Sequence, residues 1–543
     1  MKTQQLLLSG AILAALTACS GGGIDLNVST VDNSVSTGGG GGTGGSVNPC
    51  ASYQVAGGSE VRRGNYDGRN CTYSSQFVGL NNPLAVNVTI PTLSSGGVHI
   101  FQDSVVVGRN VNTGAAPASG TGPTLTIEPG NTLAFADSAD YVLVNRGSRL
   151  NANGTASQPI VFTSFADAVS NTAGANDVSQ WGGIVINGNG ITSNCTDAQR
   201  TSNACHVLSE GQPSNYGGND AADNSGTLRF VIVKHTGFEV APNDELNGIT
   251  FNAVGSGTTL ENVQVYSTFD DGFEFFGGSV NARNLIALYV RDDALDFTDG
   301  YNGTITNALV IQWRTEGNHC IELDNVGSGR FSAATPTTPV TRPVVNNMTC
   351  IMSAQPLGTH GLSRGAIVRL GGQIELNNSI FFTPYGDTVN AGTPNNPCLI
   401  LESDQTVSGA NAGTTRVTNT VFACGETLVT SPAIGGQAAD LWLRGQGTAT
   451  FNVRNQLLSP TTTPALSTLN LLEGATSTTP ANRTFYTRTP IAQITAGSPA
   501  AALFTGSGLP SQIGAVTQTL DWTTPWAFGL RAANADAPLW FAQ

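Results

Sequence analysis

One short pattern returns four times between residues 247 and 325, and it limits the possible folds more than any other feature of the chain. In each copy a polar residue stands between two apolar ones: Ile249-Thr250-Phe251, Phe273-Glu274-Phe275, Leu295-Asp296-Phe297 and Ile321-Glu322-Leu323. The third residues lie 24, 22 and 26 positions apart, which is too long for a helical period and is typical of one turn of a parallel β-helix. The pattern therefore predicts an all-β chain folded as a parallel β-helix.

The triplets also predict where their side chains point. Alternate side chains of a strand face opposite sides of the sheet, so the apolar residues should face the core and the middle residues should face outward. The outward residues would then stack in one column: Thr250, Glu274, Asp296 and Glu322. Two acidic pairs, Asp270-Asp271 and Asp292-Asp293, precede the middle triplets and also stand 22 positions apart. We expect an acidic cluster on the outer surface.

Composition favours one long solenoid and limits its partners. Each coil of a solenoid needs only its neighbours, so the usual limit on domain size does not apply. The 66 glycines and the 11% of charged residues suit short strands joined by tight turns. The net charge of −14 and the pI near 4.7 argue against nucleic acid or an anionic surface as a partner, because a polyanion needs a basic footprint. Cations and neutral ligands fit better.

The N-terminus has the features of a lipoprotein signal peptide. An apolar run at residues 6–16 ends in Leu16-Thr17-Ala18-Cys19, which has the form of a lipoprotein cleavage site. The run is too short to cross a bilayer. We predict that residues 1–18 are removed and that Cys19 is lipidated. Ser20, rather than Asp, follows the cysteine, which in lipoproteins of this type implies sorting to the outer membrane. The predicted location is therefore the outer membrane, through a lipid anchor, at the cell surface.

Eight cysteines remain after Cys19, and they fall into four close pairs. An exported protein enters an oxidising compartment, so disulfides are expected. A zinc site is disfavoured because no Cys-x-x-Cys occurs and the pairs are spread along the chain. We predict four bridges, which join Cys50 with Cys71, Cys195 with Cys205, Cys320 with Cys350, and Cys398 with Cys424.

The chain is predicted to have a tether, two caps and a long coiled region. Residues 19–48 are rich in Gly and Ser and should form a flexible tether. Residues 49–107 should form an N-terminal cap, which a solenoid needs to protect its first coil. The β-helix is predicted over residues 108–426, with a polar insertion at residues 189–226; insertions on solenoids often gather on the binding face. Residues 427–543 should form irregular coils and a C-terminal cap.

An asparagine recurs just before a strand in six successive places. Asn tolerates left-handed turn geometry, and stacked amides can hydrogen-bond to one another. We predict a structural ladder of these residues, with an exposed polar binding row as the alternative. Its members are Asn262, Asn284, Asn307, Asn347, Asn378 and Asn419.

Several stretches resemble those of bacterial surface and secreted lipoproteins with a right-handed, pectin-lyase-like β-helix. They are Thr124-Leu125-Thr126-Ile127-Glu128-Pro129-Gly130, Trp181-Gly182-Gly183-Ile184, Asp270-Asp271-Gly272-Phe273-Glu274-Phe275-Phe276-Gly277-Gly278, Ile513-Gly514-Ala515 and Asp521-Trp522-Thr523. The resemblance covers nearly the whole chain after the signal peptide and implies a right-handed coil. It implies no activity, because a fold alone does not specify one.

The acidic residues form the candidate site: Asp270, Asp271, Glu274, Asp292, Asp293 and Asp296, with His319 and Glu322 one coil on. Coils stack about 4.8 Å apart, so these carboxylates repel one another when unpaired. The basic residues nearby in sequence, Arg283, Arg291 and Arg314, are too few to neutralise them. One interpretation is a solvated acidic face. A second is binding of Ca²⁺ by the two acidic pairs, because Ca²⁺ prefers hard oxygen ligands; no twelve-residue Ca²⁺ loop or nonapeptide repeat is present.

The third interpretation is cleavage of a polysaccharide. Asp271-Gly272-Phe273-Glu274 followed by Asp292-Asp293 is similar in type and spacing to the acidic signature of polygalacturonases, in which one carboxylic acid donates a proton and others activate water. This resemblance implies catalytic roles for Asp271, Asp292 and Asp293. The Gly-His-Gly and Arg-x-Lys motifs of that family are missing, and Lys234 is the sole lysine after the signal peptide. No basic clamp for a uronic acid carboxylate is evident.

We therefore predict an outer-membrane lipoprotein that binds a cation, with calcium as the candidate cofactor, or a glycan on its acidic face. Ligand binding is assigned to Asp270, Glu274, Asp296, His319 and Glu322. The predicted partners are the membrane, through the lipid anchor, a glycan or nutrient ligand, and an outer-membrane transporter, but no nucleic acid. A polysaccharide hydrolase or lyase and a purely structural surface protein are the alternatives. Four other histidines are expected to be turn or packing residues: His99, His206, His235 and His360.

Overall fold

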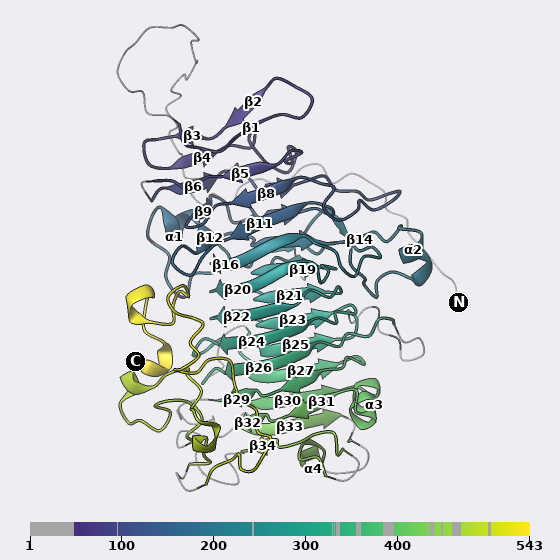
Figure 1. Ribbon diagram of the computed structural model, residues 1–543, viewed down its shortest axis with the longest axis vertical. Helices are drawn as coiled ribbons and strands as arrows, with labels where there is room; N and C mark the ends of the chain where they lie inside the picture. Colours follow the sequence, from purple (N-terminus) through teal and green to yellow (C-terminus); the bar gives the residue numbers. More distant parts are fainter. Residues whose placement is uncertain are drawn as a thin grey trace, which may run out of the picture. The chain divides into compact units, whose positions relative to one another are not determined.

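Parallel strands stack one above another along most of the described chain (Figure 1). The computed structural model describes residues 48–543 except residues 95, 242–243, 328–329, 331, 333–336, 355–359, 384–395, 432, 435–438, 447–448, 459–468 and 498–500. The all-β parallel β-helix predicted from the triplets is confirmed.

Ten strands, one from each coil, form the sheet that carries the triplets. Its members pair in parallel throughout, so each triplet lies beside the next: Thr250 is opposite Glu274, which is opposite Asp296, which is opposite Glu322. The strands are β7 (Val105–Val107), β10 (Val142–Val144), β13 (Ile184–Asn187), β19 (Ile249–Asn252), β21 (Phe273–Phe276), β23 (Leu295–Thr298), β25 (His319–Asp324), β27 (Arg364–Arg369), β30 (Pro397–Glu402) and β33 (Glu426–Ser431).

The remaining strands of the coils form a second, 18-stranded sheet. Its members are β3 (Asn65–Tyr66), β4 (Cys71–Tyr73), β5 (Val88–Ile90), β6 (Val98–Phe101), β8 (Thr124–Ile127), β9 (Thr132–Phe135), β11 (Arg149–Asn153), β12 (Ile160–Ser164), β16 (Gly226–Lys234), β20 (Thr259–Tyr266), β22 (Ala282–Leu288), β24 (Thr304–Ile311), β26 (Val344–Ile351), β28 (Glu375–Asn377), β29 (Ile380–Phe382), β31 (Arg416–Thr418), β32 (Val421–Ala423) and β34 (Gln456–Leu457).

The six asparagines of the predicted ladder bend this second sheet. All have positive φ, between 49° and 62°, a conformation that Asn adopts more readily than most residues. The Asn284 amide donates to Asn262 at 2.6 Å, and the Asn307 amide donates to Asn284 at 2.8 Å. The structural interpretation of this row is therefore correct.

Short hairpins and helices lie outside the two main sheets. Three antiparallel hairpins are β1 (Ser52–Gln54) with β2 (Val61–Arg63), β14 (Val207–Leu208) with β15 (Asn215–Tyr216), and β17 (Glu239–Ala241) with β18 (Asp244–Glu245). The described helices are α1 (Phe165–Ala168), α2 (Asp197–Thr201), α3 (Asp404–Ala412), α4 (Ala439–Leu443) and the 3₁₀ turns η3 (Pro480–Asn482), η4 (Ile491–Gln493), η5 (Ala532–Asn534) and η6 (Trp540–Ala542).

Stacked apolar side chains fill the interior, as the triplets predict. Phe275 is fully buried between Phe251 and Phe297, with ring centroids 5.0 Å and 5.3 Å away. Burying one such side chain stabilises the fold by about 1.5–3 kcal/mol. All four predicted disulfides are present: Cys50–Cys71, Cys195–Cys205, Cys320–Cys350 and Cys398–Cys424.

The coils begin before residue 108, within the region predicted as an N-terminal cap. Strand β4 pairs in parallel with β6, β5 with β8, and β7 with β10. His99, on β6, is buried and hydrogen-bonds to the Tyr73 hydroxyl at 2.9 Å, so it is a packing residue as expected.

The C-terminal region begins with coils and then turns back along the solenoid. Strands β33 and β34 still pair in parallel with earlier coils. The described residues after 468 pack their apolar side chains against the outer side of the second sheet (Figure 1). The Gln264 amide binds both the carbonyl and the N–H of Phe528, at 2.7 Å and 2.8 Å. This part lies along the side of the coils, where the sequence predicted a cap.

The signal peptide, the lipidation site Cys19 and nearly all of the tether lie outside the described residues. Among the residues that the structure does describe, none of the helices has the length and apolar character needed to cross a membrane.

Candidate functional site

Two rows of polar side chains run across the coils on the outer face of the ten-stranded sheet. The upstream row comes from positions just before or at the start of the strands and consists of Asn247, Asp271, Asp293, His319 and Arg364. The strand row lies three positions further along each strand and consists of Thr250, Glu274, Asp296 and Glu322. Because the strands are parallel and in register, side chains from distant sequence positions meet.

The upstream row is tied together by hydrogen bonds between coils. The Asn247 Oδ1 accepts the backbone N–H of Asp271 at 3.0 Å, Asp271 Oδ1 accepts that of Asp293 at 3.0 Å, and Asp293 Oδ1 accepts that of His319 at 2.7 Å. Each side chain thus satisfies a backbone donor of the next coil, which buried N–H groups require. The fold needs an acceptor at these positions, and an amide supplies it as well as a carboxylate.

The site is only partly exposed, whereas the sequence predicted an acidic cluster on the outer surface: Asp270, Asp292, Asp296 and Glu322 are half-buried. Asp271, Glu274 and Asp293 are only 7%, 6% and 4% exposed. The prediction that the middle residues point away from the core is correct, but other chain segments cover them. Two hairpins supply Glu210 and Glu245 from outside the sheet, and the Gly211 N–H binds the Asp244 carboxylate, which ties the hairpins to each other.

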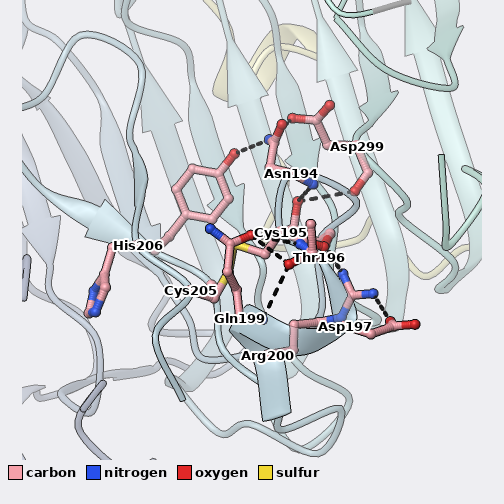
Figure 2. Close-up of a disulfide and its surroundings, with 12 residues drawn as sticks. Asn194, Cys195, Thr196, Asp197, Gln199, Arg200, Cys205, His206 and Asp299 are labelled. Atoms are coloured by element: carbon pink, nitrogen blue, oxygen red, sulfur yellow. Dashed lines mark hydrogen bonds and ion pairs between the residues drawn. A yellow bond between two sulfur atoms is a disulfide. The ribbon is translucent and has the colours of Figure 1, made fainter. Parts of the chain in front are cut away.

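The insertion that contributes Glu210 is cross-linked within itself by the disulfide Cys195–Cys205. Figure 2 shows this disulfide beside α2, with Arg200 reaching Asp197 and Asn194 reaching Asp299. The Arg200 guanidinium also donates to the Thr192 carbonyl at 2.7 Å. The insertion is therefore anchored to the strand end at Asp299, close to the acidic residues. His206 hydrogen-bonds to Arg146 at 2.8 Å, which agrees with a packing role.

Sheet and covering segments together line an open polar pocket of about 380 Å³. It is lined by Glu210, Glu245, Asn247, Asp270, Asp271, Glu274, Asp292, Asp293, Asp296, Asn318, His319, Glu322, Leu362, Arg364 and Arg369. All eight residues of the predicted candidate site are among them. The three arginines expected near the cluster do not line it; Arg364 and Arg369 do, from a coil far ahead in sequence.

Positive charge gathers at one end of the pocket. His319 Nδ1 lies 2.8 Å from Asp293 Oδ1 and 3.3 Å from Glu322 Oε2. Arg369 binds Glu322 and also Asp324, whose Oδ1 accepts its Nε–H at 2.6 Å. The carboxylates on β25 and the neighbouring Asp293 are therefore paired.

A second histidine reaches the site, although the sequence placed it elsewhere. His360 Nδ1 lies 3.1 Å from Asp292 Oδ2, and its ring packs edge-on against Phe269 with centroids 5.0 Å apart. The Asn318 amide donates to the other oxygen of Asp292 at 2.6 Å. The expectation that His360 is only a turn or packing residue is wrong, because the loop before β27 brings it over the sheet. His235 is buried beside Asp167, at 3.6 Å, and packs as expected.

The carboxylates at the other end have no such partners, and their pKa values rise. Burial raises the pKa of Asp271 and Glu274 well above the usual range, and their carboxylate neighbours Asp270 and Glu210 raise them further. Burial followed by the charge of Glu322 does the same to the pKa of Asp296. These groups resist ionisation in the empty pocket.

The paired end behaves differently. Burial would raise the pKa of Glu322, but His319 and Arg369 outweigh it and hold the pKa at about 2. Burial would lower the pKa of His319, but Asp293 and Glu322 raise it to about 9. Burial raises the pKa of Asp293 to about 8, against the opposing charge of His319. The pocket thus has a neutralised end on β25 and β27 and an unneutralised end on β19, β21 and β23.

Three groups of side chains bring possible ligand atoms within 4.8 Å of one another. They are Asp270 with Asp271 and Asp292, then Asp271 with Glu274 and Asp296, and finally Asp293 with His319 and Glu322. Asp296 Oδ1 is buried and has no hydrogen-bond partner in the described residues. The first two groups share Asp271 and contain oxygen ligands only, which is the ligand type that Ca²⁺ prefers.

Sequence reasoning missed several residues of the pocket. Asn247 could have been found by extending the register of the acidic pairs one coil toward the N-terminus. Glu245, Arg364 and Arg369 in the pocket, and His360 beside it, carry no local signal, because loops of irregular length precede them. Of the predicted residues, Asp270, Asp271, Glu274, Asp292, Asp293, Asp296, His319 and Glu322 are brought together.

Comparison with known proteins identifies the fold family. No curated protein matches the chain, and no solved structure matches it. A family model described as a pectate-lyase-like beta helix domain matches residues 112–440, which is more than half of the 543 residues. The match agrees with the stacked parallel strands and with the resemblance found in the sequence. The chain therefore belongs to the family of proteins with a pectate-lyase-like beta helix domain.

Proposed function

We propose that the pocket binds a divalent cation, with Ca²⁺ as the preferred ion, at its unneutralised end. The observation that carries the proposal is the position of Asp271, which belongs to two groups of carboxylates whose oxygens lie within 4.8 Å of one another. Ca²⁺ takes six to eight oxygen ligands at about 2.3–2.6 Å. Each of the two groups, Asp270 with Asp271 and Asp292, or Asp271 with Glu274 and Asp296, offers three carboxylates, which with one or two oxygens each give three to six of these ligands.

The distribution of positive charge selects this end. Among the described residues, Asp270, Asp271, Glu274 and Asp296 take part in no ion pair, whereas Asp293 and Glu322 face His319 and Arg369. A purely structural role for the cluster leaves the burial of these unpaired carboxylates unexplained, because burying a charge without a partner is unfavourable. A bound cation supplies the missing partner.

Thermal melts in calcium and in chelator test the proposal. A ligand that binds only the folded state raises stability by mass action, so Ca²⁺ should raise the melting temperature in a saturable way. Mg²⁺ should do so less, because it demands a near-ideal octahedron and gives up water reluctantly. A flat calcium titration would contradict the proposal.

Cleavage of a polysaccharide is the second candidate function, and the pKa values of two residues favour it. Acid and base roles require carboxyl groups whose surroundings push their pKa values apart. Burial raises the pKa of Asp293 to about 8, while His319 and Arg369 hold the pKa of Glu322 at about 2, so the two carboxyl groups differ in their tendency to hold a proton. Arg364 and Arg369 supply basic groups that the sequence did not reveal. Release of reducing sugar from acidic polysaccharides, lost in Asp293→Asn, would support this function.

We also propose that the protein acts at the cell surface as an outer-membrane lipoprotein. The apolar run at residues 6–16 and the cysteine at its end support this location. A surface cation site could present a glycan or nutrient to a transporter, and co-purification of detergent-solubilised native protein with a membrane partner would test that role.

A further inference from the structure

A buried arginine outside the acidic pocket joins the insertion to two earlier segments. Arg146, in the turn after β10, is only 3% exposed. Its guanidinium donates to the carbonyl oxygens of Cys205 and Gly217 at 2.7 Å and 2.6 Å, and to that of Val111. No carboxylate pairs with it among the described residues. Burial lowers the pKa of Arg146 to about 10, so this group stays charged at neutral and acidic pH.

His206 is a further acceptor for Arg146, and its two contacts fix which ring nitrogen carries the proton. His206 Nε2 lies 2.9 Å from the carbonyl oxygen of Gly114, which can only accept a hydrogen bond, so Nε2 carries a proton. His206 Nδ1 lies 2.8 Å from Arg146 Nη2, which can only donate, so Nδ1 carries none. Both bonds therefore require the neutral imidazole ring.

Protonation of His206 disrupts this arrangement. A proton on Nδ1 removes the acceptor for Arg146 and places two positive charges at a contact distance of 2.8 Å, where they repel each other. The ring is half-buried, so solvent reaches it. Histidine is the side chain that takes up a proton between pH 5 and pH 8, so a moderate fall in pH is sufficient.

The charged groups on the surrounding segments do not compensate for a second positive charge. Arg109, on the segment that carries Val111 and Gly114, and Arg149, on β11, have the same sign as Arg146. The acidic residues of the insertion have other surroundings: Asp197 pairs with Arg200, Asp220 and Asp223 accept hydrogen bonds from Ala222 and Ser225, and Glu210 lines the acidic pocket.

His206 lies directly before the hairpin that covers part of the acidic pocket. Figure 2 shows His206 beside the disulfide Cys195–Cys205. Strand β14 begins at the next residue, and its hairpin with β15 carries Glu210 to the pocket. The contacts of His206 therefore hold the start of this covering hairpin against the turn after β10.

We infer that His206 is an acid-sensitive latch for the β14–β15 hairpin. At neutral pH the ring bridges Gly114 and Arg146 and keeps the hairpin closed over the pocket. At acidic pH the protonated ring loses Arg146, and the hairpin opens more often. The disulfide and neutral hydrogen bonds such as that from Ser209 to Asn187, at 2.9 Å, remain, so the opening is local. The latch operates whether or not the pocket binds a metal.

Hydrogen–deuterium exchange with mass spectrometry tests the inference on the purified protein, in chelator, at pH 5 and pH 8. After correction for the intrinsic pH dependence of exchange, the amides of β14 and β15 should exchange about tenfold faster at pH 5, because a hydrogen bond from a charged group is lost. The side-chain amide of His206→Gln can donate to Gly114 and accept from Arg146 without taking up a proton. This variant should therefore be equally protected at both pH values.

His206→Lys carries the positive charge at both pH values and should exchange rapidly in both. The β1–β2 hairpin, which contains no histidine, is the internal control and should show no such change. Equal protection of β14 and β15 at the two pH values in the parent overturns the inference, as does a His206→Gln variant that still loses protection at pH 5. Because chelator is present throughout, neither outcome depends on the proposed cation site.

Discussion

The sharpest test of the cation site is the double variant Asp271→Asn with Asp296→Asn. Asp271 belongs to both oxygen-only groups, and Asp296 Oδ1 has no hydrogen-bond partner among the described residues. Asparagine at 271 keeps the acceptor for the Asp293 N–H, just as Asn247 serves Asp271 one coil earlier. The substitution therefore removes charge from the site while preserving the hydrogen bond between coils.

The expected rise in melting temperature follows from the coupling between calcium binding and folding. At a calcium concentration about 100 times Kd, binding adds about 2.7 kcal/mol to the free energy of unfolding. The unit at residues 48–543 has an unfolding entropy of about 1 kcal/mol/K, on a scale of about 2.1 cal/mol/K per residue. The parent protein should therefore melt about 3 °C higher in calcium than in chelator. The double variant should show no calcium response.

Differential scanning calorimetry in chelator compares the melting temperatures of the double variant and the parent without the ion. Two carboxyl groups with raised pKa values disappear, so the double variant should melt at the same temperature as the parent or above it. Asp271→Ala is the control for the hydrogen bond, because it leaves the buried Asp293 N–H without an acceptor and should cost about 1–3 kcal/mol in both conditions. A double variant that keeps the parent's calcium shift, or melts well below the parent in chelator, refutes the reasoning.

Three further predictions rest on the structure, and a fourth rests on the N-terminal sequence. In chelator, the melting temperature should fall as the pH rises from about 5 to about 9. Folding raises the pKa to about 7 for Glu210 and to about 8 for Asp293, and the stability that these groups contribute is lost as the pH rises through those values. A melting temperature that rises over this pH range contradicts the site. Phe275→Asp should unfold the coils by circular dichroism, since it buries a charge in the core and removes an aromatic side chain, at a cost of several kcal/mol. Gln264→Leu should speed proteolysis of residues 469–543, because two hydrogen bonds to Phe528 are lost; unchanged cleavage would show that they do not hold the segment. Cys19→Ser should move the protein from the membrane fraction to the soluble fraction or block its processing, and a variant that still sediments with membranes would contradict the anchor.

The fold could be predicted because successive coils repeat the same pattern of apolar and polar residues. A period of 22 to 26 residues with apolar side chains at alternate positions specifies both the stacking and the direction of each side chain. The same argument places Glu274 beside Asp296 and Asp271 near Asp293, since side chains of adjacent coils must meet. The core phenylalanines and the asparagine ladder follow from the same period.

Burial and charge balance could not be predicted, because both depend on segments outside the period. Arg364 meets His319 across 45 residues of sequence, and the intervening loop has no length that a pattern could fix. Glu210 comes from an insertion, and Glu245 comes from a two-stranded hairpin. These segments partly cover an outward row and form a pocket over it, so they change the pKa values of residues whose positions were predicted correctly.

The upstream row shows that the fold needs a hydrogen-bond acceptor at these positions but does not need a negative charge there. Asn247, Asp271 and Asp293 hold equivalent positions in three successive coils, and each accepts the backbone N–H of the next coil through its Oδ1 atom. Asn247 shows that a neutral amide is sufficient for this bond. The negative charge of Asp271 is not required for this hydrogen bond, and in the empty pocket burial beside Asp270 disfavours the charge, as the raised pKa of Asp271 indicates. Local rules of packing and polar satisfaction are broken most often at functional sites. The carboxylate at 271, where an amide would serve the fold better, is therefore the strongest argument that this pocket has a cationic ligand.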